Sequence, residues 1–510
     1  MKKRALLSVS DKSKLVPFAK GLIDLGYELI STGGTLKALR DGGLKALAVS
    51  EVTGSDEILD GRVKSLHPII HAGLLARRDD DSHTEQLKAR GIHYIDIVVV
   101  NLYPFKETIQ KEGVSEAEAI ENIDIGGPTM LRSAAKNFRD VTVVVDPSDY
   151  DEVLKQLNNG ASFDFRKTLA AKVFRHTAHY DGLIAQYFIE QTKLENPETL
   201  SLTYERQEVL RYGENPHQQA AFYKAPNVKG ASLANCKQLN GKALSYNNIQ
   251  DANAALEIVL EFPEKPAAVA VKHMNPCGVG MGDTIEAAFS KAYAGDPISI
   301  FGGIVALNRE VNEATAKQLK EIFLEIVIAP SFSEGALAIL TEKPNLRLLE
   351  TDMERHSSDK KKVVSVLGGL LIQDRDEGMV TEDMLTVATD RKPTEAELES
   401  LLFAWKVVKH VKSNAIVVAK GDQTVGVGAG QMNRVGAAQI AFDQAKDQAT
   451  DAVLASDAFF PMPDTVENAA KAGIKAIIQP GGSKRDQDSI DACNKLGIAM
   501  VMTAMRHFKH

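Results

Sequence analysis

The stretch "AAVAVKHMNPCGVG" at residues 267–280 begins as a buried strand and then sets Lys272 and His273 side by side. Successive residues of a strand point to opposite faces, so at most one of the two can share the core with the apolar residues before them. A strand end that reaches water explains Lys272 alone. Asn275–Pro276 and the Gly278–Gly280 that follow predict a tight turn, of the kind that places side chains at the mouth of a sheet.

A second stretch repeats this pattern. "AIVVAKGDQTVGVGAG" (415–430) and "AVAVKHMNPCGVGMG" (268–282) share an apolar strand, a lysine and a GVGxG turn, which indicates two related subdomains, placed at roughly 208–345 and 400–510. The segment between them, roughly 343–400, is rich in Asp, Glu and Lys and is interpreted as a surface connection.

The first part of the chain alternates strand-like and helix-like segments. Apolar runs such as those at 27–34 and 95–105 are too continuous for half-exposed strands and are typical of buried parallel strands. The sequence therefore predicts an α/β layer structure, followed by a helix-rich segment. The polar stretch 192–207 has no clear period, so we place the boundary there and expect domains at 1–195 and 196–510.

Composition narrows the function classes. A chain of 510 residues with a net charge of −8 and a pI of about 5.9 does not fit a general nucleic-acid or membrane surface, so we expect small-molecule chemistry with anions held by local basic groups. Cys236, Cys277 and Cys493 form no C-x-x-C pair, which predicts no disulfide framework, no metal cage and a reducing, cytoplasmic location. The basic N-terminus is followed by only three apolar residues, unlike a signal peptide, and we expect no membrane span.

"STGGT" (31–35) follows a strand and opens a helix, so free N–H groups and the helix dipole favour a phosphate there. Without a Walker lysine, a simple Gly-Gly turn is an equally good interpretation. Ser10 and Lys12 follow the first strand and would lie at the same sheet edge if the strands are parallel, which favours a ligand site.

Four further residues could serve a ring closure. Lys64 in "GRVKSLHP", Tyr103 in "NLYPF", Asp124 in "IDIGGP" and Lys136 in "SAAKN" supply proton donors and an acceptor. Each also has a simpler interpretation: a solvated basic face for Lys64, and favourable helix-terminal charges for Asp124 and Lys136.

The second region offers Arg211 and Tyr212 in "LRYGENPHQ", a turn able to present a guanidinium to a phosphate. "HMNPC" lacks the H-x-E element and the second cysteine of the zinc deaminase signature, so a hydrolytic zinc site is not expected. His273 is either a satisfied histidine or a general base kept neutral by the adjacent Lys272, and the Lys-His pair favours the base.

Twelve motifs occur in the order in which they occur in the family of bifunctional purine biosynthesis proteins, which nearly the whole chain resembles: "SVSDK", "STGGT", "GRVKSLHP", "NLYPF", "IDIGGP", "LRYGENPHQ", "KHMNPCG", "SIFGG", "GVGAGQ", "SDAFFPMPD", "QPGGS" and "MRHF". The resemblance implies an N-terminal methylglyoxal-synthase-like domain with inosine monophosphate (IMP) cyclohydrolase activity. It also implies two cytidine-deaminase-like subdomains that transfer a formyl group from 10-formyltetrahydrofolate to aminoimidazole carboxamide ribonucleotide (AICAR). A homodimer with transformylase sites between the subunits is implied as well.

The resemblance assigns roles by matching motif. In the cyclohydrolase it implies four catalytic residues, Lys64, Tyr103, Asp124 and Lys136, and nucleotide contacts from Ser10, Lys12, Thr32, Gly33, Gly34, Thr35, Arg62 and Asn101. In the transferase it implies catalysis by Lys272, His273 and Asn414, AICAR contacts from Arg211, Tyr212, Gly302, Glu325, Phe459 and Arg506, and folate contacts from Phe301, Arg434, Asp464, Ser483 and Lys484. Two positions depart from the family pattern: Glu325 stands where an Asp contacts the nucleotide, and Asn433 where animal members have Ser.

The resemblance implies a mechanism for each step. His273 would take a proton from the 5-amino group of AICAR as it attacks the formyl carbon, while Lys272 and Asn414 stabilise the charge that develops. The carboxamide nitrogen of the product (FAICAR) would then close the ring, and water would leave. Lys64 and Tyr103 would handle the formyl oxygen, and Asp124 with Lys136 would relay protons. Three alternatives stay open: a metal-dependent deaminase, a lyase acting on a triose phosphate, and a non-catalytic nucleotide sensor.

Overall fold

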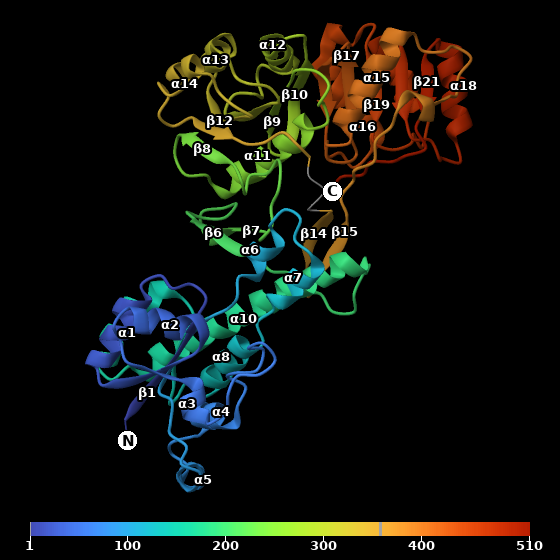
Figure 1. Ribbon diagram of the computed structural model, residues 1–510. Coiled ribbons are helices and arrows are strands. Elements are labelled where there is room, and N and C mark those ends of the chain that lie inside the picture. Colours follow the sequence, from blue (N-terminus) through green and yellow to red (C-terminus); the bar gives the residue numbers. More distant parts are fainter. Residues whose placement is uncertain (1, 356–359) are drawn as a thin grey trace. The chain divides into compact units, whose positions relative to one another are not determined.

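The computed structural model (Figure 1) describes residues 2–355 and 360–510. The chain divides into two compact units, residues 1–204 and residues 205–510, called unit 1 and unit 2 below. Each unit has its own hydrophobic core: one cluster fills unit 1, and three further clusters lie in unit 2.

Unit 1 is built on a parallel sheet of five strands in the order β3-β2-β1-β4-β5. The strands are β1 (Lys3–Val9), β2 (Tyr27–Ser31), β3 (Ala46–Ala48), β4 (Ile97–Asn101) and β5 (Thr142–Val144). The central strands are almost wholly buried, because helices cover both faces of a parallel sheet. The prediction of buried parallel strands is confirmed.

The connections of unit 1 are mostly helical: α1 (Leu15–Asp24), α2 (Gly33–Asp41), α3 (Val49–Thr53), α4 (Pro68–Leu75), α5 (Asp81–Ala89), α6 (Phe105–Ile109), α7 (Glu116–Glu121), α8 (Gly126–Lys136), η1 (Pro147–Asp149), α9 (Tyr150–Asn158) and α10 (Phe163–Thr192). The long helix α10 packs against α8 and β5. Because all five strands are parallel, the loops after β1, β2 and β4 emerge at one edge of the sheet. Ser10, Thr32 and Asn101 lie on those loops or at the strand end itself.

Unit 2 contains two consecutive runs of elements with the same order. The first run is α11 (Tyr246–Val259), β9 (Ala267–Lys272), β10 (Asn275–Met281), α12 (Ile285–Gly295), β11 (Gly303–Leu307), α13 (Glu313–Lys320), β12 (Leu324–Ala329), α14 (Glu334–Leu340) and β13 (Arg347–Glu350). The second is α15 (Glu395–Val408), β17 (Ile416–Lys420), β18 (Gln423–Gly428), α16 (Arg434–Ala445), β19 (Val453–Ser456), α17 (Asp464–Ala472), β20 (Ala476–Gln479), α18 (Asp486–Leu496) and β21 (Ala499–Met502). A short 3-10 helix, η3 (Lys446–Ala449), follows α16.

The two runs also pair their strands identically. In each, the hairpin pairs antiparallel, its first strand pairs antiparallel with the third strand, and the last three strands are parallel to one another. Strands β10 and β18 join the two runs into one sheet, which has twelve strands once β8 (Lys237–Asn240) and β16 (Thr386–Val387) are added at its two edges. The expectation of two related α/β halves is confirmed. Helices α11 and α15 share a core on one face of this sheet, while α12–α14 and α16–α18 cover the other.

The interpretation of 343–400 as a surface connection is wrong for part of its length. Strand β13 and the short strand β16 (Thr386–Val387) belong to the large sheet, and α15 begins at Glu395. The segment also includes a separate hairpin and a 3-10 helix, while residues 356–359 lie outside the described part. The hairpin consists of β14 (Lys361–Val366) and β15 (Gly369–Asp374), and the 3-10 helix is η2 (Glu382–Met384). Three further strands of unit 2 precede α11: β6 (Glu205–Leu210), β7 (Ala220–Lys224) and β8 (Lys237–Asn240).

The predicted turn at 275–280 is also wrong. Lys272 pairs with Asn275, so the turn consists of His273 and Met274, both with positive φ (51° and 63°), as expected of a two-residue hairpin loop. The following glycines lie inside β10 and serve helix packing instead. A Cβ on Gly278 would lie 1.9 Å from the carbonyl oxygen of Ala292 in α12.

The glycines of the second hairpin, β17–β18, likewise allow a helix to pack closely on the strand. A Cβ on Gly428 in β18 would lie 1.8 Å from the carbonyl oxygen of Ala437 in α16. The shared GVG pattern therefore marks a strand on which a helix lies in close contact, and it repeats because the two halves pack alike.

Candidate functional sites

In unit 1, two lysines approach the N-terminus of α2. Lys64 Nζ lies 3.6 Å from the position of a Cβ on Gly33, and Lys12 Nζ lies 3.7 Å from that of a Cβ on Gly34. Thr32 precedes the helix in an extended conformation. Two ammonium groups beside free backbone N–H groups form a site for an anion such as a phosphate.

Two other predicted residues, Thr35 and Asn101, stabilise this edge of the sheet through hydrogen bonds to the backbone. Thr35 is buried, and its hydroxyl accepts from the N–H of Val9 (2.9 Å) and donates to the Val9 carbonyl oxygen (3.0 Å), which ties α2 to β1. The side chain of Asn101 accepts from the N–H of Asp11 (2.8 Å) and donates to its carbonyl oxygen (3.3 Å). These contacts hold the loop that carries Ser10 and Lys12.

Asp124 lies just before α8 with its carboxylate held by backbone donors. Its Oδ1 accepts from the N–H of Gly127 (2.8 Å), and the N–H of Tyr103 also donates to the carboxylate. Burial raises the pKa of Asp124, and those two hydrogen bonds and the positive charge of Lys64 oppose the shift. The structure thus brings Lys64, Tyr103 and Asp124 together at one place. Tyr103 keeps 42% of its surface exposed.

Of the remaining predicted residues of unit 1, Lys136 lies away from Asp124, and Arg62 pairs with another side chain. Lys136 is the last residue of α8, and at a rise of about 1.5 Å per residue its backbone lies about 15 Å from Gly126 at the start of that helix. A direct Asp124–Lys136 relay therefore does not form within unit 1. Arg62 is exposed and forms an ion pair with Glu121.

In unit 2, Lys272 and His273 occupy the tip of the β9–β10 hairpin. The ammonium group of Lys272 donates to the carbonyl oxygens of Phe301 (2.9 Å) and Gly302 (3.0 Å), while His273 is exposed. Asp251 of α11 accepts from the N–H of Met274 (2.8 Å) and from that of His273. Lys272 is therefore the last residue of its strand, and His273 is the first residue of the turn.

Asn414 is fixed by its own set of hydrogen bonds. Its Nδ2 donates to the carbonyl oxygen of Gln431 (2.8 Å), and its Oδ1 accepts from Arg434 (2.7 Å). The guanidinium also forms a buried ion pair with Asp457. Arg434 is only 6% exposed, so this predicted folate residue acts in the structure as the support of Asn414.

The two predicted catalytic segments meet at one edge of the large sheet. The N–H of Lys412 donates to Oδ1 of Asn275 (3.0 Å), which links the Asn414 segment to the hairpin. Ile416 at the start of β17 pairs with Ser456 at the end of β19. Because β19, β20 and β21 are parallel, the loops that follow them emerge at this same edge.

Most other predicted transferase residues lie along this edge: Phe301 and Gly302 before β11, Glu325 near the start of β12, Phe459 after β19, Asp464 at the start of α17, Ser483 and Lys484 after β20, and Arg506 beyond β21. Arg211 and Tyr212 lie beyond β6, with the Arg211 guanidinium 5.7 Å from the Tyr212 ring centre. Phe301 is 64% exposed, so its ring is accessible for stacking against a planar ligand. Glu325 is ion-paired to Arg347 (2.7 Å).

Sequence reasoning missed two carboxylates at this site. Asp251 lies inside a helix whose apolar pattern gives no reason to single it out, and Asp457 is hidden in "SDAFF" beside better candidates. Only their contacts, with the turn at His273 and with Arg434, identify them.

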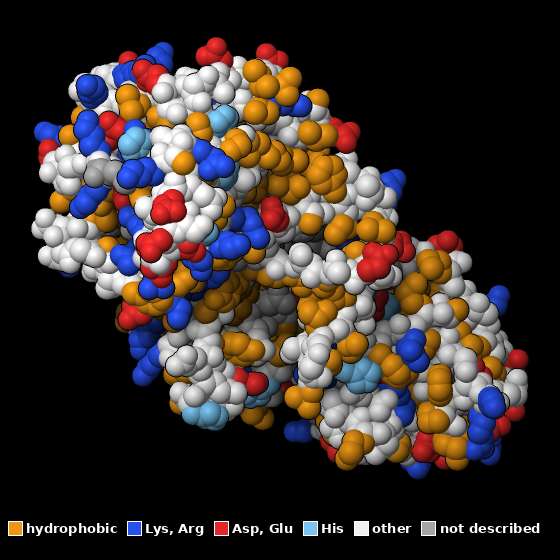
Figure 2. Space-filling model, turned by 90° about the horizontal axis from the view of Figure 1, so that it is seen from below, with side chains coloured by type: hydrophobic (Ala, Val, Ile, Leu, Met, Phe, Trp, Pro, Cys, Tyr) orange, Lys and Arg blue, Asp and Glu red, His pale blue; other side chains and the backbone are white. Residues whose placement is uncertain are grey.

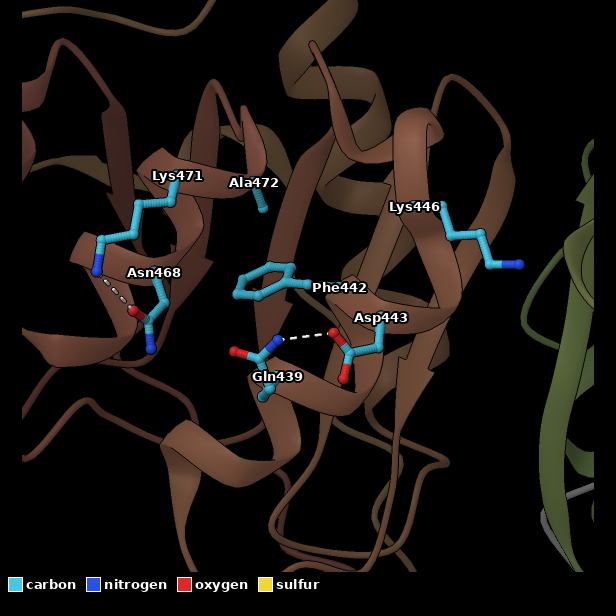
Figure 3. Close-up of a pocket in the computed structure, with 7 residues that line it drawn as sticks. All are labelled: Gln439, Phe442, Asp443, Lys446, Asn468, Lys471 and Ala472. Atoms are coloured by element: carbon cyan, nitrogen blue, oxygen red, sulfur yellow. Dashed lines mark hydrogen bonds between the residues drawn. The ribbon is translucent and has the colours of Figure 1, made fainter.

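A hollow of about 360 Å³ between α16 and α17 (Figure 3) is lined by Gln439, Phe442, Asp443, Lys446, Asn468, Lys471 and Ala472, which include none of the predicted site residues. Basic and acidic side chains are mixed over the face in Figure 2.

Within residues 2–355 and 360–510, no group of three or more His, Cys, Asp or Glu is placed to hold a metal ion. In the same ranges, no helix is long and apolar enough to cross a bilayer.

Comparisons with known proteins agree along the whole chain. Residues 14–129 match the model of the MGS-like domain, and residues 134–444 match the model described as the AICARFT/IMPCHase bienzyme. The "Bifunctional purine biosynthesis protein PurH" of Oceanobacillus iheyensis is 63% identical over 511 residues, and that of Bacillus thuringiensis 62% over 512, with all of both chains covered in each case. A structure titled "Crystal structure of ForH" is 38% identical over 37% of this chain and 98% of its own, with a TM-score of 0.34.

The fold and the comparisons together indicate an enzyme with two α/β units, one built on a parallel sheet and the other on a large mixed sheet. The chain belongs to the AICARFT/IMPCHase bienzyme family. It is a bifunctional enzyme of purine biosynthesis that combines AICAR formyltransferase and IMP cyclohydrolase activities, as the sequence motifs predict.

Proposed function

We propose that the two reactions are divided between the two units, with formyl transfer at the hairpin edge of unit 2 and ring closure at the sheet edge of unit 1. The observation that carries this proposal is the convergence of the predicted catalytic groups on two separate places. Lys64, Tyr103 and Asp124 gather in unit 1, while the hydrogen-bond link from Asn275 to Lys412 joins the two catalytic segments of unit 2.

For formyl transfer, His273 is the base that takes a proton from the 5-amino group of AICAR as the nitrogen attacks the formyl carbon. Its exposed position at the tip of a turn supports access to a substrate. Asn414 is pre-oriented by Arg434 and Gln431, so it can donate to developing charge without reorganising. The ammonium group of Lys272, held by the carbonyl oxygens of Phe301 and Gly302, belongs to the residue next to His273 on the hairpin.

For ring closure, the carboxamide nitrogen of FAICAR attacks its own formyl carbon and water leaves, which yields IMP. Lys64 and Tyr103 interact with the formyl oxygen, and Asp124 accepts the proton that the nitrogen loses. Lys64 is close to both Asp124 and the α2 N-terminus, so the reacting atoms and the phosphate would be held from one lysine-lined edge. The reaction is unimolecular, so positioning supplies much of its acceleration. In this scheme Lys136 has no direct contact with Asp124.

The formyl donor in this proposal is the cosubstrate 10-formyltetrahydrofolate. Phe301, Asp464, Ser483 and Lys484 are its proposed contacts, since they lie on the sheet edge of the hairpin site. Arg434 contributes through Asn414. Arg211, Tyr212, Gly302, Phe459 and Arg506 are the proposed contacts of AICAR, and Glu325 keeps that role only if its ion pair with Arg347 opens. The steps as written use no catalytic metal.

We also propose a cytoplasmic homodimer with transferase sites at the subunit interface. The β14–β15 hairpin, which pairs with no other strand in the described residues, supports the dimer (Figure 1). Leu367 at its tip is fully exposed, and Val363, Val364 and Leu371 are between 41% and 61% exposed. Such apolar strands need cover, and a second copy of the chain would supply it. Three free cysteines support a reducing compartment.

One assay separates this proposal from the alternatives. Purified chain is mixed with AICAR and 10-formyltetrahydrofolate in the presence of a chelator, and IMP is measured. Formation of IMP supports both activities. Activity that is lost with the chelator and restored by zinc would favour metal-dependent chemistry instead. Folded chain that binds nucleotides without turnover would favour a sensor.

A further inference from the structure

The turn that carries His273 has a backbone conformation that its residues do not favour by themselves. Both His273 and Met274 have positive φ, which crowds the Cβ of any residue except glycine. The related hairpin β17–β18 has Gly421 (φ 60°) at the position of His273. The catalytic hairpin therefore replaces the favourable glycine by a functional side chain, and the conformation needs support from outside the turn.

That support comes from Asp251. Its carboxylate accepts hydrogen bonds from the backbone N–H groups of both turn residues, at 2.8 Å for Met274. Asp251 lies in the middle of α11, which packs on β9 and β11 and contributes to the core, so its position is rigid. Its helix begins with a capping box of Ser245 and Asn248.

We propose that Asp251 is a positioning residue for formyl transfer: it holds the His273–Met274 turn in the left-handed conformation that aims the imidazole at the substrate. The inference rests on the proposed role of His273. The direction of a side chain from a turn follows the backbone dihedrals, and a base displaced by about 1 Å can lose about a hundredfold in rate. Asp251 acts through the backbone and does not touch the reacting atoms.

The test compares full-length variants by kcat and KM for AICAR. Asp251→Ala should lower kcat for transfer by about tenfold to a hundredfold with KM changed less than about threefold, because the base is misplaced and the substrate contacts remain. Asp251→Asn keeps an acceptor oxygen on the same side chain and should stay within about fivefold of wild type. Cyclisation of supplied FAICAR in unit 1 should be unchanged in both variants, and denaturant unfolding of the full chain reports whether unit 2, which carries Asp251, is still folded.

The decisive variant is Met274→Gly in the Asp251→Ala background. Glycine removes the crowding at positive φ, so the double variant should recover about fivefold or more of the lost kcat. Met274→Gly alone measures the effect of the lost side-chain packing. If Asp251→Ala does not fold, Asp251→Leu, with similar volume and no acceptor, takes its place.

Three results would overturn the inference: wild-type kcat in Asp251→Ala, no recovery in the double variant, or an Asp251→Asn variant as slow as Asp251→Ala, which would assign the effect to charge. His273→Ala is run in parallel. If it transfers formyl as fast as wild type, the proposed function of His273 fails. If it is slow while Asp251→Ala is not, only the positioning role fails.

Discussion

Arg434 donates a hydrogen bond to Oδ1 of Asn414 across 2.7 Å while its other nitrogen pairs with the fully buried Asp457. Removing the guanidinium would leave that carboxylate uncompensated in the core. We expect Arg434→Met to destabilise unit 2 by about 3 to 5 kcal/mol, the usual cost of breaking a buried pair from one side. Denaturant unfolding of the full chain measures it.

Unit 1 supplies the control for that experiment. Cyclisation of FAICAR should persist in Arg434→Met at temperatures where formyl transfer is lost, because the two units have separate cores. An unfolding midpoint equal to that of wild type would show that the pair contributes little.

If Asp124 is the base of ring closure, as proposed, the pH profile of cyclisation should follow its titration. Burial raises its pKa above the ordinary value of an aspartate, and the base form is the deprotonated one. The cyclisation rate should therefore fall as the pH drops through this raised pKa, at a higher pH than an exposed carboxyl would give. Asp124→Asn should lower the rate by about 10² to 10⁴ and remove this acid limb.

The raised pKa of Asp124 makes stability change with pH in the opposite direction from the cyclisation rate. A carboxyl with a raised folded-state pKa binds its proton more tightly in the fold, so its contribution to stability is present at low pH and is lost as the pH rises through that pKa. Asp124→Asn should remove this dependence. An acid limb that survives in Asp124→Asn would assign the proton to another group.

Helix contact explains the glycines of the hairpin strands, and a pair of matched substitutions tests it. Gly278→Ala would place a Cβ 1.9 Å from a backbone oxygen of α12, so we expect a loss of about 3 kcal/mol or more in unit 2. Gly369→Ala in β15 is the control, since its nearest neighbour would be 3.9 Å away. Equal thermal midpoints for the two variants would contradict the packing account.

We expect Lys12 to bind the nucleotide FAICAR and to take no part in the proton transfers of ring closure. Lys12→Met should raise KM for FAICAR about tenfold with little change in kcat, as for a contact equally strong in the ground state and transition state. Lys20→Met, at an exposed position on α1, is the matched control. A large fall in kcat at unchanged KM would instead place Lys12 among the reacting groups.

The sequence predicts the layers of this fold better than its turns. Continuous apolar runs identify the parallel strands of unit 1, and the repeat at 268–282 and 415–430 identifies the two halves of unit 2. The turn was misplaced because glycine signals both a turn and a close helix contact, and local sequence does not distinguish them. Here Gly278 serves the contact, while His273 forms the turn.

For the site residues, the sequence likewise predicts some features and misses others. The motifs point to Lys64, Asp124 and the Lys272–His273 pair. Lys272 ends strand β9, whereas Lys64 and Asp124 lie in loops between helices. The motifs do not reveal that Arg434 is buried, because its burial depends on the ion pair with Asp457, which is distant in sequence.

The central claim is that each unit performs one reaction, and the two half-reactions assayed separately on His273→Ala and Lys64→Ala test it most directly. His273→Ala should slow formyl transfer by about 10² to 10⁴ and leave cyclisation of FAICAR intact. Lys64→Ala should transfer normally and accumulate FAICAR. Lys420→Ala, in the related hairpin, should keep both activities. A folded His273→Ala or Lys64→Ala that loses both reactions, or a His273→Ala that transfers at the wild-type rate, would contradict the account.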